Sequence, residues 1–581
     1  MSDPLIYKQH FALPFSSEQR SYQVLKLPNG IHGLLITDPT EDLATCCLSI
    51  ATGHHDNPDD IPGLAHLCEH MITLSSKYHP EPEKYRKAVH QAGGTNNAMT
   101  NNEVTSYFYS IPVTPSNHNQ SDFENILDIF TSNFANPTFD SSFSNREIYS
   151  VDNEHTFNKS KKNRLTFQGY KLLANRDHQF SRFSTGNFDS LTESCKKYDI
   201  RTRLLEFYQK EYKPERMAFV LRGPQSLNYL QKLAITNFGK IGNSKGIKSL
   251  STTKPKVVST PSHLNILEAT WKDKYHAVPY DENNFQRAVL INKDIDSLLR
   301  VAFPVSLQHM NCTNHRQVKF FIDYWCDLFG SEASNTISSA LFSRDLISSI
   351  TTKTSVVTYD TNLIELEIAP TENGLKSIAK ILDIIFNFVS LFDIDTEKTS
   401  KFVKHLAKSM SQFNGIGIYN FLYAESQAQS VWEAKDLTVA LLHDINANGQ
   451  FFINSSTLYD FSVSGFQGAY AENDAAKEFW INEAKMFCKF MKNFVTIKKT
   501  LISYVGDLEK TSLDWLRDVP ATFQTEKEFS FDFKIASIDP NVIKLDNGQN
   551  YKLNLSPPNE FADEIIENQT KLLKVVQGTI E

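Results

Sequence analysis

The run His66-Leu67-Cys68-Glu69-His70 decides how this chain folds and what it can bind. Residues four apart lie on one face of an α-helix, so His66 and His70 can direct two imidazole nitrogens at the same ion. Neutral imidazole is a preferred zinc ligand, and a catalytic zinc takes three protein ligands and keeps one position for water. Glu69 stands beside the pair and can accept a proton from that water. The run therefore predicts a hydrolytic metal site on a helix.

The residues around this run predict that the helix is packed rather than solvated. Apolar residues such as Leu64 and Met71 flank it, and Pro62 provides a helix start. Imidazoles buried in such a helix need a polar partner, which a metal would supply. Two alternatives stay open: a surface helix with solvated histidines, and a closed structural zinc site completed by His54 or His55.

A third ligand is needed, and the segment 146–155 offers two glutamates. Glu147 and Glu154 are seven residues apart, which is two helical turns, so they share one helix face. One can bind the metal while the other orients a ligating imidazole. Glutamates at this spacing more often lie on the solvent-exposed face of a helix. The pair therefore indicates a metal site only together with the upstream histidine run.

These segments together resemble the pitrilysin/insulysin family of zinc metallopeptidases, also called inverzincins. The likeness covers roughly residues 18–570 and rests on six segments: 63–71, 93–100, 147–155, 180–187, 328–332 and 553–561. The cysteine at position 68 is typical of the insulin-degrading-enzyme branch. Residues 222–226 are most similar to fungal members, which include a protease that matures the a-factor mating pheromone.

The resemblance implies a role for each motif residue. It implies one zinc ion per chain with three ligands, His66, His70 and Glu154. Glu69 would be the catalytic base, and Glu147 would support a ligand without touching the metal. The resemblance further implies that five residues bind a substrate peptide added as an extended strand: Asn97, Ala98, Phe167, Gly330 and Glu332. Core phenylalanine is the alternative reading of Phe167, and an exposed helix-end glutamate that of Glu332.

The chain departs from the long insulysins in two ways. Those proteins have four homologous domains, and an Arg/Tyr pair in their second half binds substrate near the zinc; this chain stops as the third domain begins. Thr352-Lys353 also stands where the family usually has glycines, which puts the site for the substrate's N-terminus in doubt. Three readings follow: half of a split or truncated enzyme, an enzyme completed by a C-terminal half or a homologous subunit, or an inactive zinc-binding relic.

Bulk properties exclude several classes of protein. With 581 residues, of which 40% are hydrophobic, the chain is long enough for several domains with substantial cores. A net charge of -8 gives no sign of a nucleic-acid partner. Seven cysteines do not make a disulfide scaffold at this length, and no apolar run is long enough to span a membrane. Residues 1–19 lack the features of a targeting signal, so we expect a cytoplasmic protein.

The order of expected elements predicts an α+β fold built from two homologous sheet-plus-helix domains and a C-terminal stub. Strands at 22–27 and 31–37 flank a hairpin turn at Asn29-Gly30, and further strands are expected at 46–52 and 104–111. Helices are expected at 125–134 and 142–157. The second half repeats this order without the histidine run. The predicted boundaries are a tail (1–20), a catalytic domain (21–241), a linker (242–263), a non-catalytic domain (264–505) and a connector (506–581).

The sequence therefore predicts a zinc-dependent endopeptidase that hydrolyses extended peptides, with pheromone or propeptide processing as one setting. Its expected partner is a peptide or small-protein substrate. The alternative is a weak or inactive peptidase half that binds peptides or scaffolds another subunit.

Overall fold

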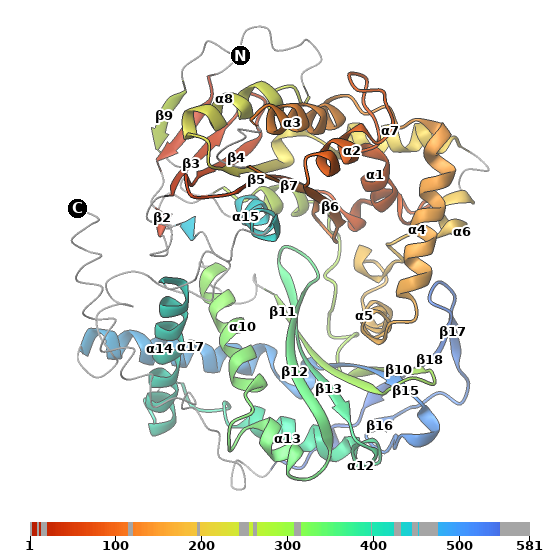
Figure 1. The fold of residues 1–581 in the computed structure, drawn as a ribbon. Coiled ribbons are helices and arrows are strands. Elements are labelled where there is room, and N and C mark those ends of the chain that lie inside the picture. The colour runs from red at the N-terminus through yellow and green to blue at the C-terminus, as the bar shows by residue number, and fades with distance from the viewer. Residues whose placement is uncertain are drawn as a thin grey trace. The chain divides into compact units, whose positions relative to one another are not determined.

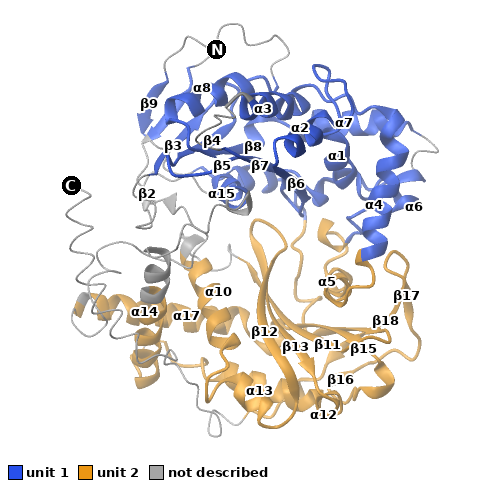
Figure 2. Cartoon of the chain, viewed as in Figure 1, with its two compact units in different colours: residues 1–157, 182–276, 422–455 blue, residues 158–181, 277–421, 456–581 orange. Residues whose placement is uncertain are grey.

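Two eight-stranded β-sheets, each with its own layer of helices, form the main part of the described chain in a computed structural model (Figure 1). The structure describes residues 3–8, 11–12, 20–113, 120–193, 198–242, 255–259, 264–306, 315–396, 398–422, 431–443, 451–452 and 474–545. Figure 2 shows two compact units: residues 1–157, 182–276 and 422–455 form the first, and residues 158–181, 277–421 and 456–581 form the second. Segment 553–561, which carries part of the family resemblance, lies outside the described residues.

An eight-stranded sheet forms the centre of the first unit, in the order β6-β7-β5-β8-β4-β3-β1-β9. Its strands are β1 (Leu5–Lys8), β3 (Ser21–Lys26), β4 (His32–Thr37), β5 (Leu43–Ile50), β6 (Thr95–Thr100), β7 (Thr105–Pro112), β8 (Met217–Gly223) and β9 (Lys256–Ser259). β8 is buried along its whole length, as expected of a strand covered on both faces. β6, by contrast, lies at one edge of the sheet.

The predicted hairpin between the first strands is confirmed. β3 pairs with β4 in antiparallel register, and the turn closes with a hydrogen bond from Leu27 N to Ile31 O (2.8 Å). Gly30 takes φ = 103°, a backbone region that L-residues with a side chain rarely adopt. The Asn29 Oδ1 accepts a hydrogen bond from Ile31 N (3.3 Å). The Asn-Gly pair thus fixes the register of the two strands that flank it.

One face of this sheet is buried by a layer of helices of the first unit. They are α1 (Leu64–Ile72), α2 (Lys84–Gln91), α3 (Gln120–Ala135), α4 (Ser144–Asn158), α6 (Phe188–Thr192), α7 (Ile200–Glu211) and α8 (Leu227–Phe238). The short helix α9 (Ile266–Trp271) has no residue in the core cluster of this layer. Leu48 of β5, Leu67 of α1 and Ile126 of α3 meet in one core cluster. Removing each such side chain from water stabilises the fold by about 1.5–3 kcal/mol, so the helix with the histidine run is firmly anchored.

The second unit repeats this plan around another eight-stranded sheet. Its main path runs β12-β13-β11-β15-β10-β18-β16, with β17 paired to β18. The strands are β10 (Arg287–Asn292), β11 (Leu298–Ser306), β12 (Ile347–Val356), β13 (Thr361–Pro370), β15 (Leu501–Gly506), β16 (Leu516–Arg517), β17 (Gln524–Glu526) and β18 (Phe531–Ile538). Its helices are α10 (His315–Gly330), α11 (Ile337–Phe342), α12 (Glu372–Leu375), α13 (Ile378–Ser390), α14 (Lys401–Leu422) and α17 (Asp474–Phe494).

Each sheet is covered on its other face by a helix that comes from a different part of the sequence. α5 (Lys162–Leu173) belongs to the second unit and packs on β10 and β15. Its Gly169 faces Ser503, whereas the neighbouring Ile502 and Tyr504 point into the main core. α15 (Val431–His443) belongs to the first unit and packs on β5 and β8.

These findings confirm the predicted α+β fold with two sheet-plus-helix units. The predicted domains are continuous stretches of sequence, and their boundaries stay a proposal. The compact units, by contrast, each combine several separate stretches of the chain. Residues 158–181 join the second unit, residues 264–276 join the first, and residues 516–538, expected in the connector, add strands to the second sheet. Throughout the described part of the chain, no helix combines the length and apolar character needed to cross a membrane.

Candidate metal centre

The helix α1 presents His66 and His70 from a tightly fixed backbone. It begins after Gly63, which has φ = 97° and lies so close to Gly186 that a Cβ would stand 2.3 Å from its Cα. Only glycine suits this approach. The side chain of Asn57 accepts a hydrogen bond from Ala65 N (2.9 Å) and so satisfies one free amide of the first turn. The start of α1, and with it the direction of both histidines, is therefore set by neighbouring loops.

Helix α4 brings the third candidate ligand to these two histidines. One ligand atom from each of His66, His70 and Glu154 lies within 4.8 Å of the others, a separation that suits a shared ion. The Glu154 Oε2 is 3.4 Å from His66 Nε2, and the two imidazole centroids are 4.9 Å apart. Glu147 lies two turns earlier on the same helix and is much more buried than Glu154.

The remaining imidazole nitrogens are held by protein groups. His66 Nδ1 lies 2.8 Å from the carbonyl oxygen of Thr185, and His70 Nδ1 lies 3.3 Å from Glu147 Oε2. Both contacts suit an Nδ1–H donor, which leaves each Nε2 as the acceptor that can bind a metal. Arg146 also pairs with Glu147 (2.8 Å). Glu147 therefore lies where it can orient one ligand without touching the ion.

The charges at the site favour a cation. Burial alone would lower the pKa of His66, but its hydrogen bond to Glu154 and the charges of Glu69 and Glu154 raise the pKa to about 9. Burial likewise opposes ionisation of Glu147, yet its bonds to His70 and Arg146 lower its pKa overall. Two imidazoles and one carboxylate under this negative potential fit a divalent zinc ion.

Glu69 lies beside His70 on α1 and contacts the edge strand β6. Its Oε2 accepts a hydrogen bond from Thr100 Oγ1 (2.6 Å), and the residue is only 8% exposed. This bond fixes the carboxylate beside the candidate ligands. The sequence indicated the strand that carries Thr100 but gave no role to the residue itself, and likewise none to the Thr185 carbonyl, because both contacts depend on how distant segments pack.

The residues expected to bind peptide are divided between the two units. Asn97 and Ala98 lie on β6, at the edge of the first sheet, where backbone groups can pair with an added strand. Phe167 lies on α5 in the second unit and contacts Phe180 edge-to-face at 5.6 Å. Gly330 ends α10 in the second unit.

The anchoring site expected for a substrate's N-terminus lies in the second unit. A Cβ on Gly330 would stand 3.0 Å from Thr352 Oγ1 of the edge strand β12, and the nearby Glu332 is exposed. Thr352, which stands where the family usually has glycine, therefore borders the expected anchor directly. The threonine that departs from the family pattern in the sequence is thus a neighbour of the expected anchoring residues.

His54 and His55 do not complete a closed zinc site in the described part of the chain. The ring of His54 contacts that of His66 edge-on at 6.3 Å, and His55 Nδ1 is 2.7 Å from the hydroxyl of Tyr275. Neither residue joins the group of His66, His70 and Glu154. The geometry therefore favours three protein ligands over four.

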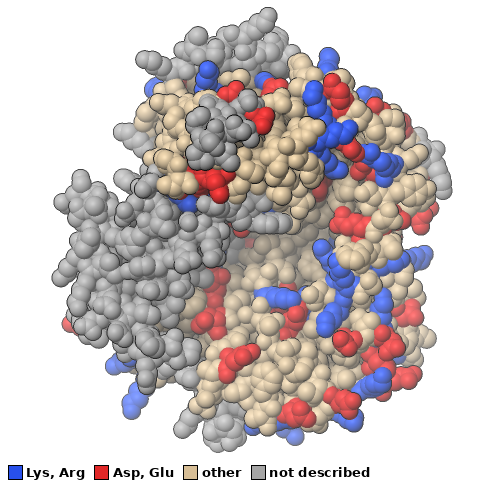
Figure 3. Space-filling view, viewed as in Figure 1, with Lys and Arg blue, Asp and Glu red and all other residues tan. Residues whose placement is uncertain are grey.

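On the face shown in Figure 3, acidic and basic side chains are interspersed over the described atoms rather than gathered in one broad patch.

Two family models match this chain. Residues 33–178 match the model described as Insulinase (Peptidase family M16), and residues 199–398 match the model described as Peptidase M16 inactive domain. The first match contains the histidine run and both glutamates of α4. The second begins just before α7 and ends after α13, so α14 and α17 lie beyond it.

Two relatives and one solved structure resemble most of the chain. It is 28% identical to "Putative protease AXL1" of Saccharomyces cerevisiae, over 97% of this chain and 48% of that protein. It is 28% identical to "Putative zinc protease mug138" of Schizosaccharomyces pombe, over 78% of this chain and 42% of that protein. The crystal structure of pitrilysin shares the fold, with a TM-score of 0.69 and 18% identity over 97% of this chain and 52% of that one. The chain thus spans about half the length of the proteins it matches.

Proposed function

Because this chain belongs to the insulinase family of peptidases, family M16, we propose that it is a zinc endopeptidase that hydrolyses extended peptides. The observation that carries the proposal is the convergence of His66, His70 and Glu154 within 4.8 Å, with Glu69 one position before His70. Three ligands leave a coordination position for water. A purely structural site would not require an acidic group beside that position.

The residues of this chain divide the reaction among them. His66, His70 and Glu154 would hold a zinc ion, which when bound lowers the pKa of a water molecule and polarises the scissile carbonyl. Glu69 accepts the proton of the attacking water and passes it to the departing amine, acting first as general base and then as general acid. Thr100 keeps the Glu69 carboxylate in place through its 2.6 Å hydrogen bond.

The edge of the first sheet supplies the proposed binding site for substrate. An extended peptide can add to β6 beside Asn97 and Ala98 through backbone hydrogen bonds, which tolerate many side chains. Phe167, Gly330 and Glu332 of the second unit are also proposed to contact the peptide. The substrate is thus proposed as a flexible peptide or small protein, with pheromone or propeptide maturation as one setting.

The cytoplasm is the proposed location. Cys46, Cys47, Cys68, Cys326 and Cys488 are free thiols in the described part of the chain. Free thiols are typical of reducing compartments, because disulfides persist mainly in oxidising ones.

The length of the relatives supports a second proposal. The chain covers 48% and 42% of the length of the two relatives. Family membership therefore does not by itself mean that this chain catalyses the reaction alone. In this second proposal the chain binds zinc and peptide but needs a further subunit, a C-terminal half or a homologue, for turnover.

One experiment separates these proposals: zinc content, peptide affinity and cleavage of a quenched fluorescent peptide, measured on the purified chain and on Glu69→Gln. We expect about one zinc per chain in both proteins and a loss of turnover in Glu69→Gln of about 10²–10⁴-fold. Exposed Glu206 changed to Gln is the matched control. Zinc and peptide binding without turnover in the wild-type chain would support the second proposal. Absence of bound zinc would refute both.

A further inference from the structure

A short segment at the end of α9 packs against the loops beside the metal helix. It comprises residues 271–275 of the first unit and begins at Trp271, the last residue of α9. Trp271 is fully buried and stacks on Tyr275, with ring centroids 5.4 Å apart and planes 15° from parallel. The Lys274 Nζ lies 4.3 Å from the Trp271 ring centroid. These contacts make the 271–275 segment a rigid unit that directs Lys274 and Tyr275 at one loop.

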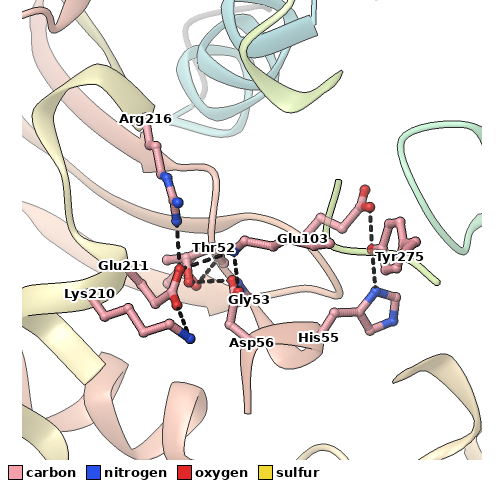
Figure 4. Close-up of polar contacts among 11 residues, drawn as sticks. Thr52, Gly53, His55, Asp56, Glu103, Lys210, Glu211, Arg216 and Tyr275 are labelled. Carbon is pink, nitrogen blue, oxygen red and sulfur yellow. Dashed lines mark hydrogen bonds and ion pairs between the residues drawn. The ribbon is translucent and has the colours of Figure 1, made fainter. Parts of the chain in front are cut away.

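Lys274 lies between two buried carboxylates and pairs with both. Its Nζ forms an ion pair with Asp56 and lies 3.1 Å from Glu211, and the two acidic side chains are 3% and 1% exposed. Arg216 also donates to Glu211 (2.6 Å), while Asp56 accepts from Thr52 Oγ1 (2.7 Å) (Figure 4). Buried carboxylates that face each other repel unless a cation lies between them, so Lys274 determines where Asp56 can sit.

Tyr275 connects a second pair of residues. Its hydroxyl donates to Glu103 Oε1 (2.5 Å) and lies 2.7 Å from His55 Nδ1 (Figure 4). A phenol has one proton, and here it goes to the carboxylate. The Tyr275 oxygen therefore accepts a hydrogen bond from His55 Nδ1–H. His55 and Glu103 are each less than 7% exposed, so this chain of hydrogen bonds is shielded from water.

The two loops held in this way are the ones that border the metal site. His54 and His55 donate backbone hydrogen bonds to the carbonyls of Asn101 and Asn102, both 2.8 Å, which joins the loop before α1 to the loop after β6. The first loop places the His54 ring against His66. The second loop follows β6, the strand with the substrate-binding edge and the residue that holds Glu69.

We propose that Lys274 and Tyr275 are positioning residues of the peptidase site. The 271–275 segment clamps the loop of residues 53–56 to the loop of residues 101–104. It thereby sets His54 against His66 and the end of β6 against Glu69. This inference rests on the proposed function for its kinetic consequence, but the effect on the metal ligands stands by itself.

The test compares Tyr275→Phe and Lys274→Met with matched controls of similar chemistry. Tyr324→Phe removes a buried hydroxyl that donates to Ser409 (2.8 Å) in the second unit, and Lys240→Met removes a lysine that pairs with Asp128. Zinc affinity by chelator competition, kcat, KM and Tm are measured for all four. We expect kcat to fall about tenfold in Tyr275→Phe and more in Lys274→Met, with KM within about threefold of wild type. Zinc affinity should fall about three- to tenfold. The controls should change Tm alone.

Two results separate this proposal from the proposed function. If the wild-type chain has no turnover, the zinc affinities still decide: weaker binding in Tyr275→Phe but not in Tyr324→Phe supports the positioning role. If Tyr275→Phe and Tyr324→Phe lower Tm alike and leave kcat and zinc affinity unchanged, the 271–275 segment serves stability only and the proposal is wrong.

Discussion

Thr100 shows how much of the proposed chemistry depends on one hydroxyl. It holds the Glu69 carboxylate at 2.6 Å, and a general base must keep its oxygen within hydrogen-bond reach of the water that it deprotonates. The change Thr100→Val keeps the shape of the side chain and removes this bond. We expect kcat for peptide cleavage to fall about tenfold while bound zinc stays near one per chain, because the loss of a charged hydrogen bond is worth about 1.5–3 kcal/mol.

The matched control is Thr131→Val on α3, which removes a buried hydroxyl that bonds to the Leu127 carbonyl (2.8 Å). It should lower stability without changing kcat. Equal activity in Thr100→Val and Thr131→Val would show that Glu69 is held by its packing and not by this bond.

His32 makes the stability of the first unit sensitive to acid. Burial in β4, helped by the charge of Lys26, lowers the pKa of His32 from 6.5 to about 3. The unfolded chain therefore binds a proton between these values and the folded chain does not, so the free energy of unfolding falls as pH drops below 6.5. In His32→Leu this contribution is absent.

We expect His32→Leu to gain about 1 kcal/mol of stability relative to wild type between about pH 7 and about pH 5.5. Urea unfolding at both pH values measures this gain. The change of exposed His90 to Leu should leave the pH dependence as it is. A parallel pH dependence in wild type and His32→Leu would mean that His32 keeps an ordinary pKa in the folded chain.

The sequence could predict the candidate metal residues because helix geometry places each pair on one face, and the family resemblance links the two pairs in one site. His66 and His70 are four apart and Glu147 and Glu154 seven apart, so their directions follow from the helical repeat. It could not predict that Thr185 offers its carbonyl to His66 or that Tyr275 donates to Glu103. Those contacts join positions more than a hundred residues apart, and no local pattern records them.

At the scale of elements, α5 depends on a glycine at its contact with the second sheet. A Cβ on Gly169 would lie 2.3 Å from Ser503 Oγ and 2.7 Å from Val289 Cγ1. Alanine would favour an isolated helix by about 1 kcal/mol, but overpacking of this kind costs about 1–3 kcal/mol or more. We therefore expect Gly169→Ala to lower the free energy of unfolding by about 1–2 kcal/mol.

A double-mutant cycle checks the cause of this effect. Ser503→Ala removes one of the two clashing groups, so Gly169→Ala should cost less in that background than in wild type. Exposed Arg164 changed to Ala serves as the control on the same helix. If the two substitutions are additive, α5 does not rest on β15 as closely as the structure has it.

Local sequence patterns predicted helices and strands well where one regular periodicity or one well-defined turn determines them. The β3–β4 hairpin follows from Asn29-Gly30, and the helix periodicity at 125–134 and 142–157 matches α3 and α4. What these patterns could not give is the sheet on which a helix packs. No helix was expected at the residues of α5 or α15, and no local pattern indicates the strands on which they pack.

In the whole molecule, two helices lie among residues of one unit along the chain but pack on the sheet of the other unit. Residues 162–173 cover the second sheet, and residues 431–443 cover the first, each on the face opposite the main helical layer. In the first unit, Cys46 and Leu48 point into the main core, whereas Cys47 and Ser49 meet Thr438 of α15. Continuous domain boundaries were expected because a sequence is divided most simply at its linkers. The chain instead passes repeatedly between the two units.

This interleaving has a consequence for how the chain is made. The strands of the first sheet have all left the ribosome by Ser259, but the helix that covers their second face ends only at His443. At a synthesis rate of about 5–20 residues per second, Thr438 becomes available to Cys47 and Ser49 on the order of ten seconds or longer after the last strand of the sheet has been made. Throughout this interval the nascent polypeptide exposes an unfinished sheet surface, which makes it prone to aggregation.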